Sequence, residues 1–169
     1  MHILPDVLDY GLKVVFCGVA AGRASARAGA YYAGPGNRFW ETLYRIGLTP
    51  RQLDPREYDR LPEYGIGLTD LVKAQYGADS AIAYEDDARE SLRARILEYA
   101  PRVLAFNGKR AAQEFFGCPV RYGLHPDSIG ETVVFVLPST SGAARGHWDE
   151  TYWAALSLHL RSLADEEGT

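Results

Sequence analysis

Three short runs of apolar, largely β-branched residues constrain the fold of this chain more strongly than any other feature. They occupy residues 13–18, 103–106 and 132–137. Runs this short, with no polar alternation, are typical of strands that are buried on both faces of a parallel sheet. Stretches with the apolar spacing of helices lie between them, at residues 84–99 and 108–116. Buried strands that alternate with helices predict an α/β layered fold.

The other segments give weaker signals. Apolar spacing predicts a helix that begins at Pro35 and ends before Gly47, and a last helix at 148–163. Between them, the sequence predicts a short charged helix or turn at 54–62 and a short strand at 65–72 that runs into another helix. Residues 164–169 predict a frayed acidic tail. Because no shift in composition marks a boundary, we expect residues 1–169 to form one domain.

The loops after Gly18, Phe106 and Leu137 follow the three strong strands. Ligands in such sheets bind outside the carboxyl ends of the strands, so these loops are expected to converge on one site. Residues 18–36 form a long glycine-rich loop, and such loops are more often functional than not. The glycines at 18 and 22 fit either a close approach to an anion or planar ligand, or a tight turn. Neither a GxGxxG spacing nor a P-loop sequence is present.

Length and composition exclude several classes of protein. The chain has 169 residues, a formal net charge of −4, and no apolar run near the ~20 residues of a membrane span. Cys17 and Cys118 are too few for a disulfide framework, an iron–sulfur cluster or a structural zinc site. The first residues lack the layout of a signal peptide. We therefore expect a cytoplasmic protein, a monomer without metal or cofactor.

Six blocks of sequence resemble, in order and spacing, the mismatch-specific uracil-DNA glycosylase and thymine-DNA glycosylase family. They are residues 12–18, 34–40, 46–53, 64–69, 106–109 and 137–145, which extend over nearly the whole chain. The resemblance implies a three-layer α/β/α fold with a short, mainly parallel sheet. It also implies that the protein flips a deaminated or mismatched base out of DNA and hydrolyses its N-glycosidic bond, with uracil opposite guanine as the first choice.

The chain departs from this family at Ala20. Val19 and Ala20 stand where the family has Ile-Asn in a Gly-Ile-Asn-Pro-Gly motif, and the family's asparagine positions the attacking water. A methyl group cannot orient or deprotonate water. Three interpretations stay open: another residue has taken over; the activity is weak or redirected, for instance to hypoxanthine or xanthine; or the domain binds nucleic acid or a nucleobase without hydrolysing it.

Asp70 is the candidate replacement for the missing asparagine. The family commonly has Lys or Asn at this position, and a carboxylate there could accept a proton from water or stabilise an oxocarbenium-like charge. The alternative is a helix N-cap, because a Thr-Asp pair precedes an apolar segment. Asn107 is a weaker catalytic candidate because it matches an ordinary structural position. His147 adjoins the last loop, and a lone histidine is more often solvated or packed than catalytic.

The base pocket implied by the resemblance comprises Gly18, Val19, Ala20, Tyr32 and Asn37. Tyr32 aligns with the aromatic residue that stacks on the flipped base, although one tyrosine among 11 is more often a core or surface residue. Asn37 is expected to hydrogen-bond the loop backbone and hold its shape.

The loop after Leu137 is the expected DNA contact. Its hydroxyl and backbone N–H groups suit phosphate binding, and the residues concerned are Ser139, Thr140, Ser141 and Gly142. Arg145 matches the family's arginine that enters the base stack or contacts the unpaired base opposite. Ala143 stands where some members have a bulkier wedge residue, and a methyl group is too small to act as one. Arg38 is expected either to reach a phosphate or to pair with Glu41.

The distribution of charge modifies what the acidic total implies. A net charge of −4 argues at face value against a nucleic-acid partner. Residues 18–45, however, hold four arginines and one glutamate, and residues 138–147 hold one arginine and no acid. A few local arginines are sufficient for phosphate contacts, so the sequence predicts a modest, salt-sensitive affinity for DNA.

Overall fold

The sheet forms the centre of the molecule. The computed structural model describes residues 2–78, 82 and 86–167, without the side chains of Asp86 and Arg145. Five strands pair in the order β2-β1-β3-β5-β4, and all pairs are parallel except β4 with β5. The strands are β1 Val14–Gly18, β2 Ile66–Asp70, β3 Val103–Asn107, β4 Gly123–Leu124 and β5 Val133–Leu137.

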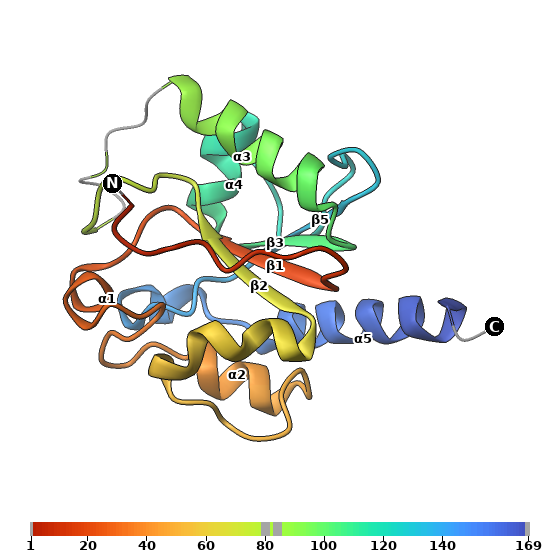
Figure 1. Cartoon of the computed structure of the whole chain (residues 1–169), viewed down its shortest axis with the longest axis horizontal. Coiled ribbons are helices and arrows are strands. Elements are labelled where there is room, and N and C mark those ends of the chain that lie inside the picture. Colours follow the sequence, from red (N-terminus) through yellow and green to blue (C-terminus); the bar gives the residue numbers. More distant parts are fainter. Residues whose placement is uncertain (1, 79–81, 83–85, 168–169) are drawn as a thin grey trace.

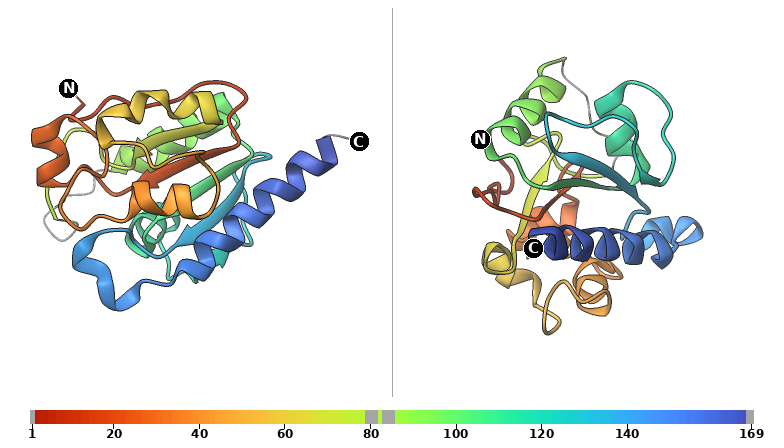
Figure 2. Two further views of the ribbon diagram at one scale, coloured as in Figure 1. Left: turned by 90° about the horizontal axis from the view of Figure 1, so that it is seen from below. Right: turned by 90° about the vertical axis from the view of Figure 1, so that its right-hand side faces the viewer.

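Helices cover both faces of the sheet (Figures 1 and 2). On one face lie α3 (Asp86–Tyr99) and α4 (Lys109–Phe116). On the other lie α2 (Phe39–Arg45), the 3₁₀ helix η1 (Pro55–Tyr64) and α5 (Glu150–Glu167). Two short helical segments, α1 (Arg23–Ala28) and the 3₁₀ turn η3 (Gly142–His147), lie in the connections. The expected three-layer α/β/α fold with a mainly parallel sheet is confirmed.

Alternation along the strands divides the core in two. Val15 and Cys17 of β1 pack with α3 and α4 residues such as Leu92 and Phe115. Phe16, between them, faces the opposite cluster, which the other helices complete. Because a strand directs successive side chains to opposite faces, a run with no polar alternation has to be covered on both sides.

The strand register aligns the carboxyl ends at one edge. Gly18 at the end of β1 is opposite Asp70 at the end of β2, and Asn107 at the end of β3 is opposite Leu137 of β5. Four loops therefore leave the sheet at the same level, as the sequence predicted for three of them. The fourth, after β2, was not anticipated, because a helix was expected there.

The segment after Asp70 corrects one expectation. Residues 71–78 form no helix, so Asp70 is the end of a strand and the helix-cap interpretation is wrong. This segment is instead tied to the loop after β1: Leu71 N donates to Gly18 O at 2.9 Å and Val72 N to Val19 O at 2.7 Å. These two bonds hold the segments that follow β1 and β2 side by side beyond the last paired residues.

Other elements differ from expectation at their ends. The glycine-rich stretch contains α1, and α2 begins at Phe39 because Pro35 lies in the preceding turn. The two-residue strand β4 had no sequence signal. At the other terminus, α5 continues to Glu167, so residues 164–167 of the expected tail are helical, and residues 168–169 of it lie outside the described residues. Glu167 pairs with Arg102, which holds the last turn.

An N-terminal segment covers the outer edge of β2. Val7 N donates to Leu68 O, and Leu68 N to Val7 O, both at 2.9 Å. Gly67 permits this approach, since a β-carbon there would stand 2.6 Å from Val7 O. The edge strand is thereby shielded from pairing with another chain. None of the helices among the described residues is long and apolar enough to cross a bilayer.

Trp153 of α5 connects the core to the loop after β5. Its fully buried ring stacks on Phe16 at 5.5 Å between centroids, and its Nε1 donates to Pro138 O at 3.0 Å. Trp153→Phe removes the donor, leaves the carbonyl unsatisfied and opens a small cavity. We expect a loss of about 2–4 kcal/mol in the free energy of unfolding, measured by urea denaturation.

Tyr152→Phe is the matched control for that variant. The neighbouring ring is only partly buried and contacts Tyr122 at 5.2 Å, a contact that phenylalanine retains. Its effect should stay within about 0.5 kcal/mol. Equal stabilities for the two variants would contradict the importance of the bond to Pro138.

Candidate functional site

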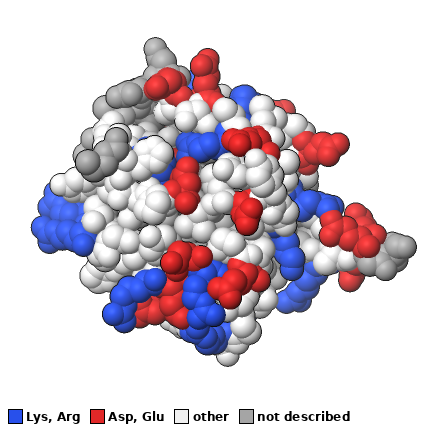
Figure 3. All heavy atoms as spheres, viewed as in Figure 1, with Lys and Arg blue, Asp and Glu red and all other residues white. Residues whose placement is uncertain are grey.

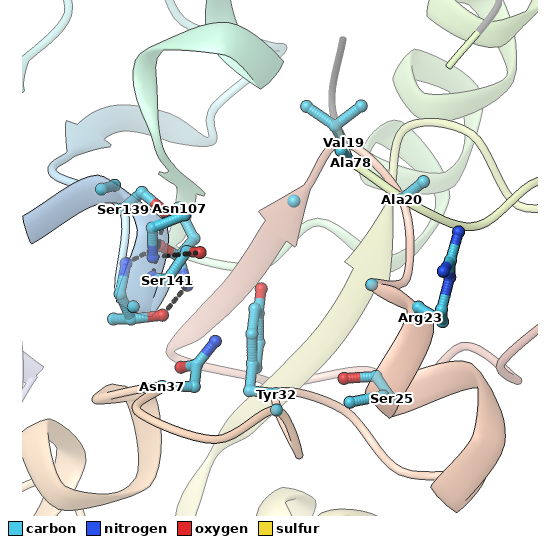
Figure 4. Close-up of a pocket in the computed structure, with 18 of the residues that line it drawn as sticks. Val19, Ala20, Arg23, Ser25, Tyr32, Asn37, Ala78, Asn107, Ser139 and Ser141 are labelled. Atoms are coloured by element: carbon cyan, nitrogen blue, oxygen red, sulfur yellow. Dashed lines mark hydrogen bonds between the residues drawn. The ribbon is translucent and has the colours of Figure 1, made fainter. Parts of the chain in front are cut away.

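A cavity of about 560 Å³ opens at the carboxyl ends of the strands. Its volume lies within the usual range for small-molecule sites. Figure 4 shows that it lies between the loop after β1, the segment before α2 and the loop after β5. The sequence-predicted residues on its wall are Gly18, Val19, Ala20, Tyr32, Asn37, Asn107, Ser139, Thr140, Ser141, Gly142 and Ala143.

Tyr32 lies at the centre of this wall with its hydroxyl directed toward the end of β1 (Figure 4). It adopts a left-handed backbone, with φ of 53°, which is uncommon for a residue with a large side chain. Flanking bonds hold it there: Ala33 N donates to Ser25 Oγ at 3.0 Å, and Trp40 Nε1 to Tyr31 O at 3.1 Å. Such over-determined strain is concentrated at functional sites.

The Tyr32 ring packs against Phe39, with 4.2 Å between centroids. Phe39 is fully buried and belongs to the core, so Tyr32 is supported from below while it lines the cavity. A rigid aromatic side chain on a cavity wall is suited to stacking on a planar ligand.

Asn37 has a structural contact through its amide oxygen. Its Oδ1 accepts from Phe39 N at 3.0 Å, which fixes the side chain at the start of α2. That bond leaves Nδ2 beside Tyr32 on the cavity wall, with no hydrogen bond to another described residue (Figure 4). The site thus offers an amide N–H pair to a ligand carbonyl.

Asn107 holds the loop after β5. Its Nδ2 donates to Thr140 Oγ1 at 2.9 Å, and its Oδ1 accepts from Thr140 N at 3.0 Å. Both ends of the amide are therefore used in shaping the cavity wall. This arrangement favours a positioning role for Asn107 over a catalytic one.

The loop after β5 is also tied to the segment before α2. Arg38 N donates to Thr140 O at 2.9 Å, and a β-carbon on Gly142 would stand 3.3 Å from Pro35 O. Within the loop, the Ser139 hydroxyl accepts from Ser141 N at 3.1 Å. The seryl oxygens therefore fold the loop, and phosphate contact from this loop stays a prediction.

Asp70 lies directly behind the cavity wall. A β-carbon built on Gly18 would stand 3.1 Å from Asp70 Oδ1 and 3.5 Å from the Tyr32 hydroxyl, so both groups approach the same point above the glycine. Asp70 is only 4% exposed and is not itself on the wall. Among the described residues that form the wall there is no carboxylate and no histidine. The absence of a side chain at Gly18 leaves Asp70 adjacent to the cavity.

Lys73 places a buried positive charge behind Asp70. Its Nζ lies 3.8 Å from Asp70 Oδ2 and 2.9 Å from Asp6 Oδ1, and it donates to the Tyr31 hydroxyl at 2.9 Å. A buried carboxylate is costly unless it is paired, and this ammonium offsets part of that cost.

Arg95 of α3 adds a second cation to the same cluster. Its Nη1 contacts Asp6 Oδ2 at 3.3 Å and donates to Asp70 O at 3.2 Å and to the Thr69 hydroxyl. Thr69 in turn donates to Asp6 Oδ1 at 2.7 Å. Two cations and two carboxylates thus hold the end of β2 in a single arrangement.

The cluster and its burial shift the pKa of Asp6 and of the neighbouring Cys17. Burial alone would raise the pKa of Asp6, but Lys73, Thr69 and Arg95 outweigh it, and the pKa lies below its ordinary value. Burial, with the charge of Asp70, raises the pKa of the Cys17 thiol. Cys17 is therefore a neutral core residue at physiological pH and is unsuited to act as a nucleophile.

The arginines that the sequence predicts as DNA contacts are Arg38 and Arg145. The Arg38 guanidinium lies over the Trp148 ring at 5.2 Å, while Glu41 pairs with Arg45, so the expected Arg38–Glu41 pair does not form. Arg145 lies in η3, and its side chain is outside the described part of the molecule. His147 is exposed at the end of the same turn.

Part of the cavity wall was not predicted from the sequence. Arg23, Ala24 and Ser25 of α1 contribute to it, as do Gly77 and Ala78 after β2. The signal for α1 was available in its alanine-rich sequence and the glycine at its C-terminal end. Nothing in the sequence indicated that residues 77–78 approach the loop after β1.

Comparisons with known proteins agree with this geometry. Residues 5–157 match the family model described as the uracil DNA glycosylase superfamily. The fold is similar to the solution NMR structure of a Methanosarcina acetivorans protein that is provisionally described as a uracil DNA glycosylase. That similarity has a TM-score of 0.60 and 27% sequence identity, and it covers 94% of this chain and 96% of that one.

The lowered pKa of Asp6 predicts a pH-dependent stability. A carboxyl whose pKa falls on folding contributes stability above its unfolded pKa, and this contribution is lost as the pH falls through the folded value. Asp6→Asn should therefore cost about 2–3 kcal/mol at pH 7, and the difference from wild type should shrink below about pH 4. Urea denaturation between pH 3 and pH 7 measures this difference.

Asp59→Asn provides the control, because Asp59 is exposed. Its effect should remain within about 0.5 kcal/mol at every pH. A difference between wild type and Asp6→Asn that did not change with pH would be evidence against the ionic role of Asp6.

Proposed function

This chain belongs to the uracil DNA glycosylase superfamily, and on that basis we propose that it is a monofunctional DNA glycosylase. It removes a deaminated or mismatched base from DNA, with uracil opposite guanine as the first choice. The observation that carries the proposal is the cavity at the carboxyl ends of the strands, with an aromatic ring, an amide donor and an adjacent carboxylate.

The cavity is suited to a base that has been flipped out of the duplex. The flipped pyrimidine stacks on Tyr32, whose ring is supported by Phe39. Asn37 Nδ2 donates a hydrogen bond to a carbonyl on the edge of the base, and uracil has such a carbonyl. Enzymes of this kind recognise a flipped base by hydrogen bonds to its edge. Val19 and Ala20, which also line the cavity, have small side chains that leave room for bases other than uracil.

Asp70 activates the water in place of the missing asparagine. The water oxygen bonds to C1′ of the deoxyribose as the C1′–N bond breaks, and the electron pair of that bond leaves with the base. The carboxylate accepts the proton that the water loses, and the departing base takes up a proton from solvent. The products are a free base and an abasic site, and the negative charge of Asp70 stabilises the oxocarbenium-like state between them.

DNA is held by the loop after β5. Arg145 fills the gap that the flipped base leaves, because Ala143 is too small to act as a wedge. The position of this loop beside the cavity, and its bonds to Asn107 and Arg38, support this assignment.

Asp70→Asn tests the mechanism. The amide cannot accept a proton, so the single-turnover rate of base excision should fall about 10²- to 10⁴-fold. Duplexes that carry uracil, hypoxanthine, xanthine or thymine opposite guanine are incubated with excess protein, and alkali then reveals abasic sites. Retention of most activity by a folded Asp70→Asn protein would remove Asp70 from the mechanism.

Ala20→Asn serves as the companion variant. It restores the family's asparagine at a position on the cavity wall, so it should recover part of the activity in the Asp70→Asn background. Recovery separates a loss of water activation from a loss of folding. The preferred base of each variant is obtained from the same set of duplexes.

Gly18→Ala tests the geometry independently of charge. The added methyl would stand 3.1 Å from Asp70 Oδ1 and must displace it. Because small displacements of catalytic groups are costly, the excision rate should fall about 10- to 100-fold while DNA affinity changes little. Gly146→Ala is the control, since a methyl there meets no atom within 4 Å. Equal rates for the two variants would contradict the proposed position of Asp70.

One observation favours a second candidate, a domain that binds a base or nucleic acid without hydrolysis. The described wall of the cavity has no carboxylate or histidine of its own. Stoichiometric protein that binds the uracil duplex and produces no abasic site on any of the four substrates would support this alternative.

A further inference from the structure

A second cavity of about 450 Å³ lies beside the first. His2, Ile3, Arg23, Ala26, Arg27 and Tyr76 line it. Arg23 contributes to both cavities, and Gly77 N, on the wall of the first, donates to Ala21 O at 2.9 Å. The two cavities therefore share a lining side chain and adjoin along this backbone contact, so a strand of nucleic acid can extend from one to the other.

The second cavity carries positive charge without an acidic counterpart. Arg23 and Arg27 are exposed, one helical turn apart on α1, and within the described residues neither forms an ion pair. By contrast, Arg51, Arg56 and Arg60 all pair with neighbouring carboxylates. No described Asp or Glu lines either cavity. Figure 3 shows the corresponding blue patch at the left edge, over α1, with no red beside it.

Tyr76 gives this basic cavity an aromatic wall. It is 53% exposed, yet its backbone is fixed by a bridge to Ala21. An exposed aromatic ring beside unpaired arginines is the combination that single-stranded nucleic acid requires, because the ring stacks on any base and the guanidinium groups meet the phosphates.

We propose that the second cavity is a subsite for the nucleotide that flanks the target on the same DNA strand. Arg23 and Arg27 contact the phosphodiester between the two nucleotides, and Tyr76 stacks on the flanking base. The inference rests on the proposed function of the first cavity. Continuity through Arg23 and the unbalanced positive charge select a DNA strand as the occupant.

Binding of labelled single-stranded oligonucleotides tests the subsite. The target is 2′-fluoro-2′-deoxyuridine, whose glycosidic bond resists cleavage, and anisotropy gives the dissociation constant at several salt concentrations. Tyr76→Ala should weaken binding about 5- to 100-fold, as expected for one lost base–aromatic stack. Arg27→Ala should weaken binding and reduce the salt slope by about 0.7, as expected for one lost phosphate contact.

Two control variants make the same kinds of substitution elsewhere on the surface. Tyr44→Ala removes a tyrosine of similar exposure on α2, and Arg56→Ala removes an exposed arginine that is paired with Asp54. Both should bind like wild type. Oligonucleotides trimmed on one side of the target should abolish the effect of Tyr76→Ala, and the side concerned identifies the flank.

The outcomes separate the two proposals. Tight binding by wild type that is unchanged in Tyr76→Ala and Arg27→Ala would overturn the subsite and leave the glycosylase proposal standing. Absence of both binding and excision in the wild type would overturn the proposed function itself. Equal losses in the control variants would also overturn the subsite, since they would indicate a nonspecific surface effect.

Discussion

The register between β1 and β2 is the constraint on which the candidate site depends. It sets Gly18 opposite Asp70, and a slip of one residue would turn the Asp70 side chain to the other face of the sheet. The parallel pairing with β3 and β5 then brings Asn107 and the loop after Leu137 to the same edge. An apolar sheet buried on both faces specifies this register, so the forces that fold the chain also align its polar residues.

Burial of charge behind the cavity is the second determinant. A carboxylate at the end of a buried strand is tolerated here because Lys73 and Arg95 lie within the same cluster. Apart from the local Lys73–Asp70 pair, the bonds of the cluster join distant parts of the chain: the N-terminal segment, β2 with the residues that follow it, and α3. The cluster therefore stabilises the fold and at the same time fixes the orientation of Asp70, whose carboxylate adjoins the cavity wall.

The sequence predicted the fold better than it predicted the site. Buried strands leave unmistakable apolar runs, whereas α1 is short, rich in Ala and Arg, and has no apolar periodicity. Asp70 could not be resolved, since Thr-Asp before an apolar segment fits a strand end as well as a helix start. The left-handed backbone of Tyr32 and the Asn107–Thr140 bonds arise from packing between segments that are far apart in the sequence. Local sequence patterns do not predict such long-range contacts.

The N-terminal segment has a consequence for how this protein should be handled. Residues near a chain terminus are ordinarily the safest to delete or to join to an affinity tag. Here Ile3 N bonds Lys73 O, Pro5 O accepts from Tyr31, and Asp6 neutralises the buried cations. Shortening this end would uncover the edge of β2 and remove the Asp6 carboxylate from the buried Lys73 and Arg95 side chains. Expression designs should therefore preserve the chain from Ile3 onward.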